Sequence, residues 1–267
     1  MAKLASPLAS VPVPVVRALN LLVLIAVFVI NGLAGSTTLI GGYNTGQLSD
    51  LLPNYFVPAG FAFSIWGLIY LFFGIFGVYQ ILPRSYDSAA INSCVGLVWI
   101  GNGILNIAWI LVWGYRILPM SVIIIIAMWG TTMIIYARLK SKYPDPTWTD
   151  AICVHTCFAL YTAWLTGASW VNVYAVSTTR DPSYVAWTIG GLVVLGVMEI
   201  AIATWAKDPI FTAVGTWTLA ANYVKNKDVD MLAPAVLGLC IILGIVTGAL
   251  AVYRVVRWRK RAEFGAL

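Results

Sequence analysis

Tryptophan and asparagine recur at helical spacing inside the most apolar stretches of this chain. Asn102, Asn106, Trp109 and Trp113 advance by four, three and four residues, which places them on one face of a helix. Indoles can stack on a flat apolar ligand and amides can orient it, so this pattern suits non-covalent binding. The alternative is structural, because buried amides also hold membrane helices together by hydrogen bonds across the bundle.

Two further stripes have the same character. Trp66 and Tyr70 lie four residues apart on one helical face. A later stripe with steps of three, four and four residues consists of Tyr161, Trp164, Ala168 and Asn172. Three aromatic faces with a few polar groups are the usual lining of a site for a flat apolar ligand. An aromatic packing core without a ligand is the competing interpretation.

Few ionisable side chains remain for chemistry. Glu199 lies well inside an apolar segment, and a carboxylate there is a candidate functional intramembrane acid, whether protonated, paired with a cation or bonded to Asn222 or Tyr223. For His155 we favour a hydrogen bond over axial ligation of a haem. Cys153 and Cys157 share a helical face from which His155 points away, so we predict no metal site. We identify no catalytic residues, and enzymatic activity stays open.

Composition limits the class of protein. The chain is 61% hydrophobic and only 10% charged, and its mean hydropathy is +0.88. These values exceed what a soluble domain tolerates and predict an all-α polytopic membrane protein in contact with lipid. The net charge of +6 comes largely from residues that flank apolar segments. It therefore indicates membrane topology and not a nucleic-acid partner.

Apolar runs and their breaks predict the transmembrane segments. The run from Arg17 resembles a signal-peptide core, but we expect it to be kept as the first transmembrane helix. The polar connection 36–56 is long enough to form a lid over a site. The expected spans are about 17–34, 57–82, 92–115, 118–138, 149–175, 184–205, 209–224 and 232–253.

The segment 209–224 is shorter and more polar than the others, so we test whether it crosses the membrane by counting the basic residues on each side. If it crosses, there are eight spans and twelve of the sixteen Lys and Arg lie on the side of both termini. If it does not, the split is nine against seven. The positive-inside rule therefore favours eight spans.

The three stripes also carry a family resemblance. Residues 58–70, Pro-Ala-Gly-Phe-Ala-Phe-Ser-Ile-Trp-Gly-Leu-Ile-Tyr, resemble the opening of the second helix in the TspO/translocator protein family, the tryptophan-rich sensory proteins. Ala59 and Phe61 stand where that family typically has proline and tryptophan. Asn106-x-x-Trp109-x-x-x-Trp113 is similar to its third helix. The stripe that begins at Tyr161 matches its fifth helix at all four positions.

This resemblance implies an architecture. It covers about residues 15–176, which would form a TspO-like five-helix bundle. Residues 177–258 would add about three transmembrane helices, giving eight, and 259–267 would form a short tail. The membrane would be a bacterial inner membrane or an organellar membrane.

The resemblance also implies a function: binding of a porphyrin-like tetrapyrrole, a sterol or a similar flat hydrophobic molecule for sensing, transport or turnover. The loop 36–56 would gate the pocket. No cofactor is assigned beyond such a tetrapyrrole ligand. The alternative function is a non-catalytic accessory or scaffold subunit, as a homodimer or in a larger membrane complex. The expected ligand-binding residues are Trp66, Tyr70, Asn106, Trp109, Trp113, Tyr161, Trp164, Ala168 and Asn172.

Overall fold

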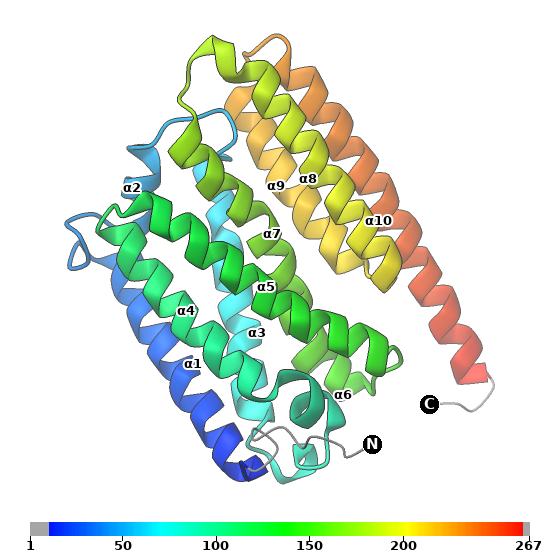
Figure 1. Cartoon of the computed structure of the whole chain (residues 1–267). Helices are drawn as coiled ribbons and strands as arrows, with labels where there is room; N and C mark the ends of the chain where they lie inside the picture. The colour runs from blue at the N-terminus through cyan, green and yellow to red at the C-terminus, as the bar shows by residue number, and fades with distance from the viewer. Residues whose placement is uncertain (1–10, 264–267) are drawn as a thin grey trace, which may run out of the picture.

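A computed structural model describes residues 11–263, and this part of the chain is built from helices (Figure 1). Short 3₁₀ or π turns precede several of the long helices. The helices are α1 (Val13–Ser36), α2 (Thr45–Asp50), α3 (Ile65–Tyr79, after a 3₁₀ turn Gly60–Ser64), α4 (Gly96–Gly114, after a π turn Ala90–Val95), α5 (Leu118–Lys142), α6 (Trp148–Asp150), α7 (Thr156–Ser177, after a π turn Ala151–His155), α8 (Val185–Ala206, after a 3₁₀ turn Pro182–Tyr184), α9 (Pro209–Asn226) and α10 (Leu232–Glu263).

Seven helical runs within the described residues are long and apolar enough to cross a membrane. They correspond to seven of the eight expected segments, which confirms a polytopic all-α membrane protein. The helix α9 is not among the seven, yet it runs beside α8 and α10 in Figure 1. Half of its residues are buried, including Thr212, Thr218 and Asn222. A helix shielded by protein needs less apolar surface than one facing lipid, which explains its lower hydropathy.

The helix α7 occupies the centre of the bundle, as Figure 1 shows. It contacts α3, α5, α8 and α9. In its most apolar stretch 72% of the residues are buried, against 11% in α10. The largest core cluster gathers around it and includes Phe73, Trp99, Phe158 and Tyr161. Inside hydrocarbon this close packing holds helices together, since lipid offers them no hydrophobic incentive to associate.

The C-terminal helices pack as a unit against α7. A glycine permits the closest approach between α8 and α9: a Cβ atom at Gly215 would collide with the carboxyl group of Glu199. The helix α10 lies along α9 and α8. It continues to Glu263, past the predicted end near residue 253 and into the predicted tail. Residues 264–267 of that tail lie outside the described part.

The connection 36–56 contains the short helix α2, and the chain after α2 is hydrogen-bonded to α9. Asn44 caps α2, accepting a hydrogen bond from Gln47 N (2.9 Å). Beyond α2 the chain is fastened to α9, because Asn222 Nδ2 donates to the carbonyls of Tyr55 (3.0 Å) and Phe56 (2.8 Å). A lid function of this connection stays a prediction.

Candidate functional site

A cavity of about 50 Å³ lies near the end of the bundle that carries α2. Six of the nine expected ligand-binding residues are in its wall. They come from three helices: Trp66 on α3, Trp109 and Trp113 on α4, and Trp164, Ala168 and Asn172 on α7. The helical spacing therefore selected residues that the fold brings together.

The four indoles form two pairs in the wall of this cavity. Trp109 and Trp113 are stacked, with ring centroids 5.6 Å apart and an interplanar angle of 15°. Trp66 and Trp164 meet edge to face, with centroids 6.1 Å apart. Aromatic pairs prefer these two arrangements, so the walls are stable without a ligand.

Asn172 is the main polar anchor of the wall. Its Oδ1 accepts hydrogen bonds from Trp109 Nε1 (3.2 Å) and Ser121 Oγ (3.1 Å), and its Nδ2 donates to the carbonyl of Ala168 (3.1 Å). These bonds tie α4, α5 and α7 together beside the cavity. Both acceptor positions of its amide oxygen and one of its two N–H donors are therefore used within the protein.

Two indole N–H groups in the wall are left without a partner. Trp113 and Trp164 are 4% and 3% exposed, and the Nε1 atom of each lacks a hydrogen-bond partner within residues 11–263. A buried donor without an acceptor costs about 1–3 kcal/mol. Such groups in a cavity wall are suited to bind an acceptor atom of a ligand or of water.

Three expected site residues lie outside the cavity wall. Asn106 Nδ2 donates to the Tyr161 hydroxyl (3.1 Å) while its Oδ1 accepts from Asn31 (2.7 Å). Tyr70 stacks on Trp66, with centroids 5.4 Å apart, and meets Phe28 edge to face. In this arrangement the Asn106 amide joins α1, α4 and α7. This is the structural alternative to ligand binding that the sequence left open for the buried amides.

Glu199 is 1% exposed and faces α9, away from the cavity. Its Oε2 has no hydrogen-bond partner among the described residues. The Nδ2 of Asn222, one of the partners considered from sequence, donates instead to two backbone carbonyls. A functional role of this carboxyl stays a prediction.

His155 does not make the hydrogen bond that we favoured. Both of its ring nitrogens lack a partner in the described part of the chain, although the residue is only 4% exposed. In residues 11–263 no group of three or more His, Cys, Asp or Glu side chains is arranged to hold a metal ion.

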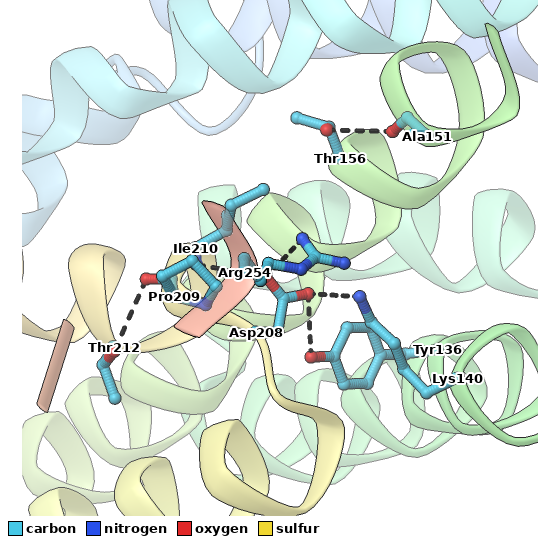
Figure 2. A network of polar contacts seen from close by, with 9 residues as sticks. All are labelled: Tyr136, Lys140, Ala151, Thr156, Asp208, Pro209, Ile210, Thr212 and Arg254. Atoms are coloured by element: carbon cyan, nitrogen blue, oxygen red, sulfur yellow. Dashed lines mark hydrogen bonds and ion pairs between the residues drawn. The ribbon is translucent and has the colours of Figure 1, made fainter. Parts of the chain in front are cut away.

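Sequence reasoning missed a buried ionic cluster at the other end of the bundle, shown in Figure 2. Asp208 Oδ2 forms an ion pair with Lys140 Nζ and accepts a hydrogen bond from Tyr136 (3.1 Å). Its Oδ1 accepts from Ile210 N (3.1 Å) and lies 3.7 Å from Arg254. Asp208 is the N-cap residue of α9, and no local signal in the sequence indicated its partners from α5 and α10.

Burial and ion pairing act in opposite directions on Asp208. Burial raises the pKa of its carboxyl, but the attraction of Lys140 and Arg254 outweighs burial and holds the pKa below its ordinary value. The carboxylate is thus charged at neutral pH, which keeps the ion pair intact.

Comparison with known proteins accords with this architecture. No curated protein and no solved structure matches the chain. A family described as TSPO-like protein matches residues 17–253, a region that reaches from α1 into α10 and includes both the aromatic cavity and the three C-terminal helices. The chain therefore belongs to the TSPO-like protein family.

Proposed function

We propose that this protein binds a flat hydrophobic ligand, a tetrapyrrole or a sterol, in the aromatic cavity between α2, α3, α4 and α7. The observation that carries the proposal is the pair of unpartnered indole N–H groups of Trp113 and Trp164 in the cavity wall. Membership of the TSPO-like family supports the same class of ligand.

Each part of the wall has a role in this proposal. The rings of Trp66 and Trp109 offer apolar faces on which a planar ligand can stack. The N–H groups of Trp113 and Trp164 donate to carboxylate or hydroxyl oxygens on the ligand, which fixes its orientation. Ala168 is the small residue that leaves the space open.

The ligand must open the cavity to enter. Sites for molecules of this size are about 300–1,000 Å³, whereas the cavity is about 50 Å³. We propose that α2, which contributes Thr45 and Ser49 to the wall, is the segment that moves. Because the chain at Tyr55 and Phe56 is hydrogen-bonded to α9, this end of the connection stays in place when the cavity opens.

A scaffold subunit is the second candidate, and one observation favours it. The centre of the bundle is filled by the protein's own side chains, with Trp99, Phe158 and Tyr161 at most 1% exposed. A scaffold needs such a filled core and no ligand-sized space. The experiment below separates the two candidates.

The test is titration of the detergent-purified protein with protoporphyrin, and separately with cholesterol, followed by tryptophan fluorescence. We expect saturable quenching by at least one ligand. Trp164→Phe keeps an aromatic ring but removes one N–H donor, so it should weaken binding about 3- to 10-fold, the usual effect of one hydrogen bond. Ala168→Trp fills the cavity and should abolish binding.

The control is Trp187→Phe, because Trp187 is a 63% exposed indole outside the cavity wall. Its affinity should equal that of the wild type. Absence of saturable binding by folded protein, or equal weakening in Trp187→Phe and Trp164→Phe, would reject the ligand-binding proposal. Partners that co-purify with the protein would then favour the scaffold.

A further inference from the structure

A second feature, outside the aromatic cavity, is a cleft of about 500 Å³ at the end of the bundle where α5, α8 and α10 meet. The short helix α6 and the turn before it close one side (Figure 1). Because α5 and α8 end here, at Lys142 and Ala206, the cleft lies at the level where transmembrane spans leave the hydrocarbon. This is the depth of lipid headgroups.

The cleft carries an excess of positive charge. Four basic side chains line it, while the acids at the cleft are Asp145 in its wall and Asp208 in its floor. The basic residues are Lys140, Lys207, Arg254 and Arg257. The same end of the bundle holds most of the chain's Lys and Arg, so it faces the side where anionic lipid attracts basic residues.

Two of these four cations are closely paired with a carboxylate and two are held less tightly. Lys140 is paired with Asp208, and Arg257 Nη2 contacts both carboxylate oxygens of Asp145 (2.8 and 2.9 Å). Arg254 approaches Asp208 only to 3.7 Å, and the guanidinium has further donors to offer. Lys207 Nζ lies 5.5 Å from the centroid of the Tyr253 ring.

Aromatic side chains complete the cleft. Trp148 and Trp258 meet edge to face with centroids 5.4 Å apart. With Trp205 they present three exposed indoles: Trp148 is 59% exposed, Trp205 53% and Trp258 42%. Indoles at a membrane interface pack on the glycerol and upper acyl region of lipids while their N–H groups stay near polar atoms.

We propose that this cleft binds the phosphate headgroup of an anionic phospholipid. Arg254 and Lys207 contact the phosphate, and Trp205 and Trp258 cover the first part of the acyl chains. The ion pair of Lys140 with Asp208, drawn in Figure 2, forms the floor of the cleft. This site is independent of the aromatic cavity, since the two share no lining residue.

The test is native mass spectrometry of the full chain in neutral detergent, with dioleoylphosphatidylglycerol as the probe and dioleoylphosphatidylcholine as the zwitterionic comparison. We expect one phosphatidylglycerol to be retained preferentially. Lys207→Gln should weaken its binding about five-fold, the effect of one basic residue near a membrane surface, and Lys207→Gln/Arg254→Gln should weaken it further.

The matched control is Arg259→Gln/Lys260→Gln, which removes the same charge from the same end of α10 but from residues outside the cleft wall. It should retain the lipid as the wild type does. Equal losses in the control and cleft variants, or equal retention of the two lipids, would overturn the proposal. Displacement of the lipid by inorganic phosphate at a similar concentration would also overturn it, because the ligand would then be a free anion. If the double variant does not fold, Lys207→Gln alone decides.

Discussion

The aromatic cavity and the basic cleft lie toward opposite ends of one bundle, near α2 and α6 in Figure 1, and they are built from similar aromatic material. The cavity is about 50 Å³ and the cleft about 500 Å³. Within the span, side chains must fill space and satisfy one another. At the interface, water and headgroups can satisfy cations and indole N–H groups, so the cleft can stay open.

The two regions also differ in how they hold helices together. Around the cavity the links are neutral hydrogen bonds, such as those of Asn172 with Trp109 and Ser121. Beneath the cleft the link is a buried ion pair, Lys140 with Asp208. An ion pair is far more sensitive to loss of one partner than a neutral bond is.

The largest effect is expected for Lys140→Met. The substitution leaves the Asp208 carboxylate buried with Arg254, which is 3.7 Å away and 39% exposed, as the remaining counter-charge. This should lower the free energy of unfolding by about 3–5 kcal/mol. Thermal unfolding of the purified protein in detergent measures the change. A small loss of stability would show that water or Arg254 compensates for the missing Lys140 charge. The ionic link beneath the cleft would then be no more sensitive to substitution than the neutral hydrogen bonds around the cavity.

The control for Lys140→Met is the double variant Lys140→Met/Asp208→Asn. It removes both charges while Asn keeps the cap on Ile210, so it should recover most of the lost stability.

The stability of the wild-type protein at low pH provides a second check of the ion pair. Because the pKa of Asp208 is lowered in the folded protein, the stabilisation is present at neutral pH and above the ordinary Asp pKa of about 4. It is lost as pH falls further through the lowered value.

A smaller effect is expected when the chain at Tyr55 and Phe56 is detached from α9. Asn222→Ala leaves the Phe56 carbonyl without its donor, at a cost of about 1–3 kcal/mol. Amide hydrogen exchange around residues 51–59 should accelerate. Asn226→Ala is the graded control and should cost less, because the Tyr55 carbonyl keeps its bond from Asn222. Unchanged exchange in Asn222→Ala would contradict the anchor that we assign to this residue.

The smallest effect belongs to the rim of the cleft. Arg257 and Asp145 form an ion pair whose side chains are 39% and 31% exposed. Arg257→Gln should therefore lower stability by less than about 1 kcal/mol, and raising the salt concentration should shrink that difference. Thermal unfolding at low and high salt measures both. A loss of stability as large as that of Lys140→Met would mean that burial does not determine how much each of these two ion pairs contributes to stability.

Sequence predicted the positions of the helices well and their partners poorly. The expected spans match the long helices closely, because apolar length and breaks are local properties of the chain. The exception is α10, whose helix continues through a basic stretch to Glu263. Charged residues end an apolar span but do not end a helix, so hydropathy underestimated its length.

The candidate site was predicted in part for a similar reason. Spacing placed Trp109 and Trp113 on one face with Asn106, but the structure puts only the two indoles in the cavity wall. Asn106 lies deeper along the same face and finds Tyr161 and Asn31 as partners. A stripe runs along the whole helix, whereas a cavity occupies one level of it.

The sequence by itself determined that this is a polytopic helical membrane protein and which helix faces carry its indoles and amides. Both follow from composition and from the 3.6-residue repeat, which are read within one segment. Only the tertiary structure decided that α9 is sheltered, that Asp208 is paired with Lys140 of α5 and Arg254 of α10, and that Trp113 and Trp164 share a cavity. These features depend on how each helix is rotated and paired, and that is set by packing between residues far apart in the chain.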